Sequence, residues 1–277
     1  MRTRTRTATA GGGGNAFGDG VMNDMHAADL ERDARLAREA AFHDTRFAED
    51  TRAATDKFYA ITGSSFAFYR KRVLDDIAGK TLLEYGCGTG SSAFDAAAAG
   101  AHATGIDISP VAIEMGVHEA ASRGLSDRTH FAVMNAEALD FPDASFDRVC
   151  GSGILHHLDL KKAYGEIARV LRPNGYGIFL EPLGHNPLIN WYRRRTPEMR
   201  TEDEHPLLKS DLALAREYFS KIRSRFFHFA ALGAVPLRRS FLFKPAIAIG
   251  EGIDRVLLSS VSPLKNQAWM VVIELHK

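Results

Sequence analysis

The chain has 277 residues, of which 45% are hydrophobic, enough for one large domain or two small ones with a sizeable core. Its 35 lysine and arginine residues balance 34 acidic residues, so the formal net charge of +1 creates no overall field that would attract nucleic acid or an anionic membrane. The two cysteines, Cys87 and Cys150, fit neither a disulfide framework nor a zinc cluster, and they favour a reducing compartment.

The N-terminal part divides into two stretches of different composition. Residues 1–24 contain Arg-Thr pairs and four consecutive glycines without the apolar core of a secretory signal, so we expect a disordered tail. Residues 25–78 are expected to form a helical cap, because apolar residues recur near helical spacing before residue 60 and again over 66–78. The most apolar later stretch, 241–261, is interrupted by charged residues, so we expect no membrane span and a cytoplasmic protein.

Short strand patterns alternate with helical patterns after residue 79. We expect strands at 81–85, 102–107, 129–134, 147–151 and 176–181, and helices at 91–100, 110–122 and 159–171. Ser109 is placed to cap the second of these helices, and Pro110 suits its first turn. Such alternation predicts an α/β domain over 79–277, with a parallel sheet covered on both faces.

The pattern changes beyond residue 181. Residues 182–208 are rich in proline, arginine and histidine and are too long and irregular for an ordinary crossover, so we interpret them as a lid. A helix is expected at 210–223, a strand at 225–230, an apolar insertion at about 231–266 and a final strand at 268–275.

Three glycines follow an acidic residue in the stretch LLEYGCGTG, residues 82–90. Glycine loops between a strand and a helix let backbone N–H groups approach a ligand. A phosphate-binding P-loop needs a lysine, which does not follow Gly90, and a dinucleotide fingerprint needs glycine where this chain has Ser91. Both phosphate interpretations are therefore weakened, and a tight turn without a ligand is the remaining structural alternative.

The pattern E-x-G-x-G-x-G from Glu84 to Gly90 resembles that of the class I S-adenosylmethionine-dependent methyltransferases. The resemblance implies a Rossmann-like, doubly wound fold with a seven-stranded, mostly parallel sheet whose last strand is antiparallel. It also implies S-adenosylmethionine as cofactor, with Glu84 near the methionine ammonium. Gly86, Cys87, Gly88 and Gly90 would then pass beneath the methionine moiety and the ribose.

Two later strand ends extend the resemblance. Asp107 lies where the family has an acidic residue that accepts the ribose hydroxyls, and Ile108 would lie against the adenine. Because Ser109 can cap the following helix, we expect Asp107 to be free for a ligand. Asn135, Ala136 and Glu137 stand where the family commonly has an aspartate and a small residue beside the adenine; asparagine departs from that pattern. The resemblance covers about residues 75–181 well.

The candidate catalytic residues follow the fourth and fifth strands, at the edge where ligands bind in such sheets. His157, with His156 as second choice, is a candidate general base, and Glu181 is a third candidate. The alternatives are that the two histidines simply open the next helix and that Glu181 anchors a turn. We expect no metal, because the sequence shows no ligand cluster that demands one.

The lid is the source of candidate acceptor contacts, namely His185, Trp191, Tyr192 and His205. Arginines at 193–195 and 200 would either bind an acidic group of the acceptor or pair with the acidic residues at 198 and 202–204. Together with the insertion and the N-terminal helices, the lid suits a small aromatic or terpenoid specialised metabolite, methylated on oxygen, nitrogen or carbon.

Other functions stay open at this point. The near-neutral charge disfavours RNA as a partner, and the alternatives are a protein or RNA methyltransferase, a non-catalytic nucleotide-fold module and a pyridine-nucleotide oxidoreductase. Homo-oligomerisation through the N-terminal helices is a further expectation.

Overall fold

The computed structural model describes residues 30–31, 33–45, 60–197, 201 and 204–277. The expected tail at 1–24 and much of the expected helical cap lie outside the described residues. The chain divides into two compact units, Met1–Arg38 and Glu39–Lys277. In the first unit the described residues are helical, and in the second unit residues 39–45 are helical as well. Within the described part, no helix has the length and apolar character needed to cross a bilayer.

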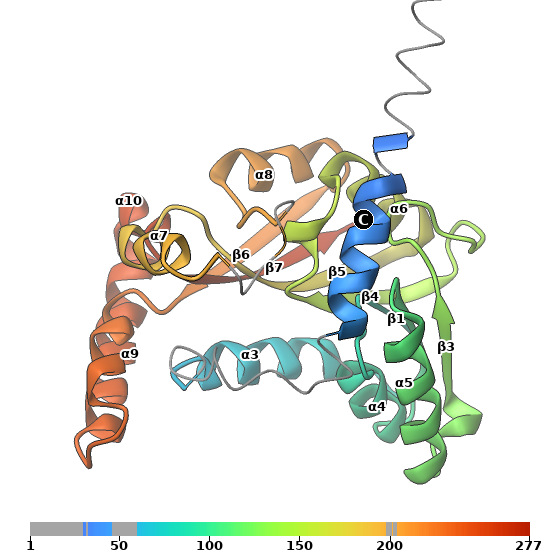
Figure 1. Cartoon of the computed structure of the whole chain (residues 1–277), viewed down its shortest axis with the longest axis horizontal. Helices are drawn as coiled ribbons and strands as arrows, with labels where there is room; N and C mark the ends of the chain where they lie inside the picture. The colour runs from blue at the N-terminus through green and yellow to red at the C-terminus, as the bar shows by residue number, and fades with distance from the viewer. Residues whose placement is uncertain (1–29, 32, 46–59, 198–200, 202–203) are drawn as a thin grey trace, which may run out of the picture. The chain divides into compact units, whose positions relative to one another are not determined.

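A seven-stranded sheet forms the centre of the second unit (Figure 1). Its strands are β1 (Thr81–Tyr85), β2 (His102–Asp107), β3 (Thr129–Val133), β4 (Phe146–Ser152), β5 (Leu171–Pro182), β6 (Lys221–Phe227) and β7 (Met270–His276). Their order is β3-β2-β1-β4-β5-β7-β6, and β7 runs antiparallel to both of its neighbours. This confirms the Rossmann-like sheet with an antiparallel last strand, and it places the switch in strand order between β1 and β4, where ligands bind in doubly wound sheets.

Helices surround the sheet, and the expected cap of one of them is present. The helices are α3 (Gly63–Leu74), α4 (Ser91–Ala98), α5 (Pro110–Ser122), α6 (Leu160–Val170), α7 (Pro187–Arg194), α8 (Lys209–Leu214), α9 (Phe243–Ser260) and α10 (Ser262–Lys265). Short 3-10 helices are η2 (Ser126–Arg128), η3 (Leu155–His157), η5 (Ala215–Glu217) and η6 (Ala230–Leu237). The Ser109 hydroxyl accepts a hydrogen bond from the Ala112 N–H, so it caps α5 as predicted.

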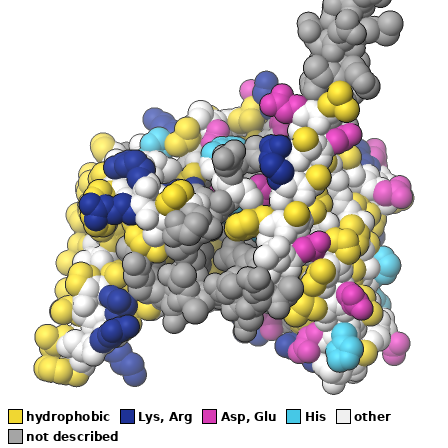
Figure 2. Space-filling view, in the orientation of Figure 1, with side chains coloured by type: hydrophobic (Ala, Val, Ile, Leu, Met, Phe, Trp, Pro, Cys, Tyr) yellow, Lys and Arg dark blue, Asp and Glu magenta, His cyan; other side chains and the backbone are white. Residues whose placement is uncertain are grey.

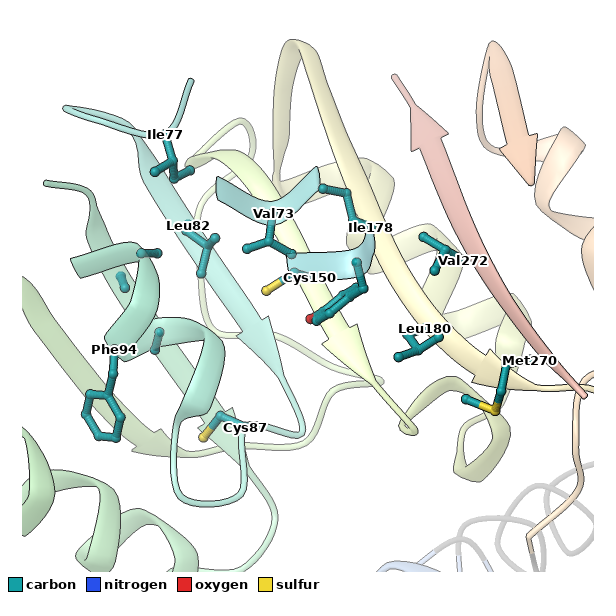
Figure 3. Packing of buried hydrophobic residues seen from close by; sticks show 14 of the residues in the cluster. Val73, Ile77, Leu82, Cys87, Phe94, Cys150, Ile178, Leu180, Met270 and Val272 are labelled. Carbon is teal, nitrogen blue, oxygen red and sulfur yellow. The ribbon is translucent and has the colours of Figure 1, made fainter. Parts of the chain in front are cut away.

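Two hydrophobic clusters cover the two faces of the sheet. Neighbouring residues of β1 point to opposite faces, so Leu82 packs in one cluster and Leu83 in the other. The Leu82 cluster includes Val73 of α3, Phe94 of α4 and Cys150 of β4 (Figure 3). The Leu83 cluster receives α6, whose buried residues include Ala163 and Ile167. Burial on both faces explains why apolar residues occupy successive positions at Leu82 and Leu83 of β1 and over Met270–Ile273 of β7.

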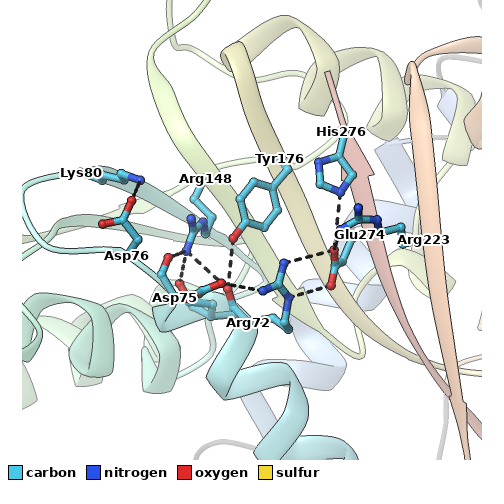
Figure 4. Close-up of polar contacts among 10 residues, drawn as sticks. Arg72, Asp75, Asp76, Lys80, Arg148, Tyr176, Arg223, Glu274 and His276 are labelled. Atoms are coloured by element: carbon cyan, nitrogen blue, oxygen red, sulfur yellow. Dashed lines mark hydrogen bonds and ion pairs between the residues drawn. The ribbon is translucent and has the colours of Figure 1, made fainter.

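A buried arginine fastens α3 to the sheet at the edge opposite the glycine loop (Figure 4). Arg148 is 2% exposed, and its Nη1 donates hydrogen bonds of 2.7 Å to the carbonyl oxygens of Val73 and Asp75. Its guanidinium carbon lies 4.3 Å from the centre of the Tyr176 ring. These contacts satisfy carbonyl groups near the C-terminal end of α3 that have no partner within the helix.

Two predicted boundaries are wrong in the second half of the chain. The helix expected at 210–223 is only α8 followed by η5, and it ends at Glu217. The strand expected at 225–230 begins at Lys221 instead and pairs with β7 from there. Because β6 is the edge strand, it is largely exposed and carries Lys221 and Arg223, so it lacks the buried apolar run that marks an inner strand. The helix expected at 66–78 also differs, since α3 covers Gly63–Leu74.

The α9 helix exposes an apolar stripe. Ile249, Ile253 and Val256 are 66%, 44% and 63% exposed, and their spacing puts them on one side of the helix. In Figure 2, hydrophobic side chains cover the region of α9, with lysine and arginine side chains beside them.

Candidate functional site

The glycine loop joins β1 to α4 at the switch point of the sheet. Gly86, Gly88 and Gly90 have φ angles of +55°, +51° and +87°, in the left-handed region that favours glycine. The Gly90 N–H donates a 2.7 Å hydrogen bond to the Cys87 carbonyl and closes the loop just before the first turn of α4. The loop therefore brings bare backbone and a helix N-terminus to the ligand-binding edge.

Packing gives two of these glycines a second reason to lack a side chain. A Cβ added at Gly90 would lie 2.7 Å from the ring of Phe131, and one at Gly86 would lie 2.6 Å from Cδ1 of Ile154. Contact with Ile154 also holds the segment after β4 against the loop, so the two histidines that follow lie near the loop. The sequence analysis considered a ligand or a tight turn as the reason for the glycines, and packing against Phe131 and Ile154 is a further reason at Gly90 and Gly86.

Glu84 binds the N-terminus of α4. Its side chain is 4% exposed, and its two oxygens accept hydrogen bonds from the N–H groups of Ser92, at 3.1 Å, and Ala93, at 2.8 Å. Burial raises the pKa of Glu84 to about 7, although these two hydrogen bonds favour the ionised form. Glu84 is therefore a buried acid at the base of the loop, close to the place expected for a cationic group.

Asp107 is not free of local contacts, which corrects one expectation. One carboxylate oxygen accepts a hydrogen bond from the Gly88 N–H at 2.8 Å, and the other accepts one from the Ser109 N–H at 2.9 Å. Asp107 therefore ties the glycine loop to the end of β2. Each carboxylate oxygen has a second lone pair, so the residue retains acceptor capacity for ligand hydroxyls.

The third strand end is a compact turn beside Asp107. The Met134 N–H donates to the Asp107 carbonyl at 2.9 Å, and the Asn135 side-chain oxygen accepts from the Glu137 N–H at 2.9 Å. Ala136 is 8% exposed, and Ile108 is half-buried. Glu137 accepts from the Asp159 N–H at 2.8 Å and so contacts the cap of α6. The residues expected around an adenine are thus neighbours in space.

The three candidate catalytic residues lie together at the ends of β4 and β5. Glu181 is fully buried; one of its oxygens accepts from the N–H groups of Ile154 and Leu155, and the other lies 2.7 Å from Nδ1 of His156. Glu181 therefore anchors the turn after β4 and orients an imidazole. His157 points differently, with its Nδ1 3.2 Å from Oε2 of Glu39.

The expected lid is closed at its base. Leu183 and Leu207, 2% and 0% exposed, form an isolated β-bridge, and α7 lies between them in the sequence. The His205 N–H donates to the His156 carbonyl at 3.0 Å, which brings the end of this segment to the catalytic candidates. Arg193 pairs with Glu204 at 2.8 Å, so this one arginine has the acidic partner that the second interpretation offered, although the pair is largely buried.

The other acceptor candidates in the lid occupy its outer part. Trp191 is 47% exposed, and the guanidinium of Arg195 lies 4.2 Å from the centre of its ring. Tyr192 is half-buried, and Nε2 of His185 accepts a hydrogen bond from the Lys209 N–H at 3.1 Å. Their contact with an acceptor stays a prediction.

Residues of the N-terminal helix were not foreseen as part of this site. Oε1 of Glu39 accepts a hydrogen bond from the Thr201 hydroxyl, its Oε2 faces His157, and His43 stacks edge-on against His157 at 5.6 Å. The Ser109 hydroxyl donates to Asp44. The Glu-x-x-x-His spacing, which puts Glu39 and His43 on one helix face, was the available signal, but it occurs within an ordinary charged helix.

Comparison with known proteins agrees with this geometry. Residues 83–179 match the family described as methyltransferase domain. The chain contains a class I methyltransferase domain. This confirms the family predicted from the glycine loop.

Individual relatives share mainly this region. A 27-O-demethylrifamycin SV methyltransferase of Amycolatopsis mediterranei is 41% identical over 100 residues, which are 35% of this chain and 37% of that protein. The sterol 24-C-methyltransferase ERG6A of Gibberella zeae is 38% identical over 104 residues, 36% of this chain and 27% of the relative. The chain thus spans well under two thirds of these curated relatives.

Solved structures share the fold over more of the chain. Phosphoethanolamine N-methyltransferase 2 of Haemonchus contortus, in complex with S-adenosyl-L-methionine, has a TM-score of 0.60 at 17% identity, covering 85% of this chain and 60% of that one. The [4+2]-cyclase SpnF has a TM-score of 0.51 at 22% identity, covering 75% and 81%. At such identities the likeness establishes the fold alone.

Proposed function

We propose that the chain transfers the methyl group of S-adenosylmethionine to a small, apolar specialised metabolite, with a hydroxyl oxygen as the preferred acceptor atom. One observation carries the choice of acceptor atom: His156 and Glu181 form a buried histidine–carboxylate pair, 2.7 Å apart, beside the glycine loop. A base oriented in this way is what removal of a hydroxyl proton requires. The matched methyltransferase region, residues 83–179, includes Glu84, Asp107 and His156.

The loop residues suit the proposed cofactor. When bound, S-adenosylmethionine supplies an electrophilic methyl group on a sulfonium sulfur. The left-handed glycines keep side chains away from the backbone where the methionine moiety would lie, and Glu84 offers a buried carboxylate near its ammonium group. Asp107 keeps lone pairs for ribose hydroxyls, and Asn135 and Ala136 would lie along the adenine.

The residues after β4 and β5 would prepare the acceptor. Glu181 holds Nδ1 of His156, so Nε2 is the nitrogen available to take the hydroxyl proton, while Ile154 keeps this turn against the glycine loop. Nε2 faces Glu204 of the lid, whose nearer oxygen is 3.8 Å away. The lid would exclude water and provide apolar contacts through Trp191 and Tyr192.

Calorimetry with the purified chain tests the cofactor. We expect S-adenosylmethionine to bind, and Asp107→Asn to weaken binding about tenfold or more, because the hydrogen bonds to Asp107 lose their charge. His130→Asn, on an exposed strand residue, should bind as the wild type does. Binding of NAD in place of S-adenosylmethionine would overturn the proposal.

Mass spectrometry of producer extracts, with and without the gene, tests the transfer. A metabolite heavier by one methyl group in the presence of the gene is expected. With that acceptor, Glu181→Gln should lower turnover while leaving cofactor binding intact. Cofactor binding without any methylated product would instead favour a binding module or a rearrangement catalyst on this fold.

A further inference from the structure

Two imidazoles face one buried carboxylate beside the proposed base. Oε2 of Glu39 lies 3.2 Å from Nδ1 of His157 and 3.6 Å from Nε2 of His43. The side chains of Glu39, His157 and His43 are 7%, 11% and 23% exposed. Among the residues that the structure describes, this Glu39 oxygen is inaccessible to solvent and accepts no well-aligned hydrogen bond. A buried anionic oxygen in such surroundings calls for a compensating cation.

The separations of these atoms match those of metal ligands. Nitrogen and oxygen atoms about 2.1 Å from a tetrahedral Zn²⁺ ion lie about 3.4 Å from one another. The two distances measured from Glu39 lie on either side of this value, and all three atoms are within 4.8 Å of each other. Two of the three ligands come from one helix face, since Glu39 and His43 are four residues apart.

The surroundings orient the carboxylate as in metal sites. The Thr201 hydroxyl donates to the other oxygen of Glu39, which fixes the carboxylate plane and leaves Oε2 toward the histidines.

A second arrangement of nearby groups is less suitable. His156, His157 and Glu204 are also close enough to share an ion. However, Glu204 already pairs with Arg193 at 2.8 Å, so a metal ion there would lie beside a guanidinium.

We propose that Glu39, His43 and His157 bind one divalent transition-metal ion of the Zn²⁺ type. Mixed nitrogen and oxygen ligands favour Zn²⁺ or Co²⁺ over Mg²⁺, which prefers oxygen ligands throughout. Three protein ligands leave one tetrahedral position open. If the proposed methyl transfer is correct, this position would hold the acceptor oxygen and lower the pKa of its hydroxyl, next to His156.

Titration of the metal-stripped full chain with Co²⁺, followed by visible absorption and completed by competition with Zn²⁺, tests the site. We expect one Co²⁺ per chain with the intense absorption of tetrahedral coordination. Glu39→Gln and His43→Ala should each weaken binding about 100-fold, and Thr201→Val should weaken it about tenfold because it supports a ligand without being one. His118→Ala is the matched control, since His118 is exposed on α5, and it should bind as the wild type does.

Failure of this inference can be separated from failure of the proposed function. Absence of stoichiometric Co²⁺ binding, or equal binding by Glu39→Gln and His118→Ala, would overturn the metal site whatever the activity. S-adenosylmethionine binding, measured on each variant, reports whether the fold is intact. If Glu39→Gln no longer binds S-adenosylmethionine, the metal titration is judged on His43→Gln instead, because His43 is the most exposed ligand and its replacement is conservative. Stoichiometric metal binding without methyl transfer would keep the site and overturn only its role in the reaction.

Discussion

The buried carboxylate of Glu84 should make the stability of the protein depend on pH. Burial raises its pKa from 4.5 to about 7. The folded state therefore disfavours the ionised form, so the stability associated with this group is fully present below pH 4.5 and is lost as the pH rises through about 7. At about 1.4 kcal/mol for each tenfold change in proton affinity, the total loss is about 3 kcal/mol.

The substitution Glu84→Gln removes this titration while keeping one acceptor oxygen for the N-terminus of α4. The assay is urea denaturation without cofactor, which gives the free energy of unfolding of each protein. The value for the variant minus the value for the wild type should be about 2 to 3 kcal/mol larger at pH 8 than at pH 5. Comparing the two proteins at each pH cancels the histidines, which titrate in both. Glu119→Gln is the control: Glu119 is exposed and paired with Arg123, so its difference from the wild type should stay nearly constant over this range.

An equal difference between wild type and Glu84→Gln at the two pH values would refute the reasoning. It would mean that Glu84 is already ionised at pH 5. The hydrogen bonds from Ser92 and Ala93, with the helix dipole, would then outweigh the cost of burial.

Three further substitutions test buried parts of the fold. Gly90→Ala should lower the melting temperature and cost about 2 to 4 kcal/mol of stability, because φ is +87° and the new Cβ would lie 2.7 Å from Phe131. If adding Phe131→Ala restored the full stability, the positive φ would contribute nothing. Arg148→Met should lower the free energy of unfolding, measured by urea denaturation, by about 2 to 4 kcal/mol because it leaves buried carbonyl groups without donors. The control Arg172→Met, at an exposed ion pair, should lower it by less than about 1 kcal/mol. Equal losses for the two variants would contradict this explanation. His228 follows β6 and is 1% exposed, with its Nε2 2.9 Å from the Ser65 hydroxyl oxygen. Burial lowers the pKa of His228 from 6.5 to about 4, so its charging should cost about 2 kcal/mol of stability at pH 5. His228→Gln should remove that part of the acid sensitivity measured between pH 7 and 5.

The parallel half of the sheet was predictable because its inner strands are buried on both faces and its helices carry local signals. Thr81–Tyr85 and His102–Asp107 have the expected bounds, and Pro110–Ser122 begins at its predicted cap. Local sequence was a poorer guide at the edge of the sheet. There β6 alternates charged and apolar residues, and its position is decided by pairing with β7, which is far away in the chain.

The site shows the same division between local and distant information. The glycine loop and Asp107 lie in short motifs, so their proximity followed from the order of the strands. Their local hydrogen bonds did not, since the sequence indicated a free Asp107 where the structure has a link from Gly88 to Ser109. Glu39 and His157 are more than 100 residues apart in the sequence and come together only through tertiary packing. No short sequence motif could have predicted this contact.

The bridge between Leu183 and Leu207 makes the segment above it a replaceable module. Since its two ends are paired and buried at the sheet, a change of length between them leaves the strands where they are. The entropic cost is small, because each doubling of a flexible loop adds only about 0.6 kcal/mol. A designed change of the segment between these two residues should therefore leave the register of β5 and β7 unchanged.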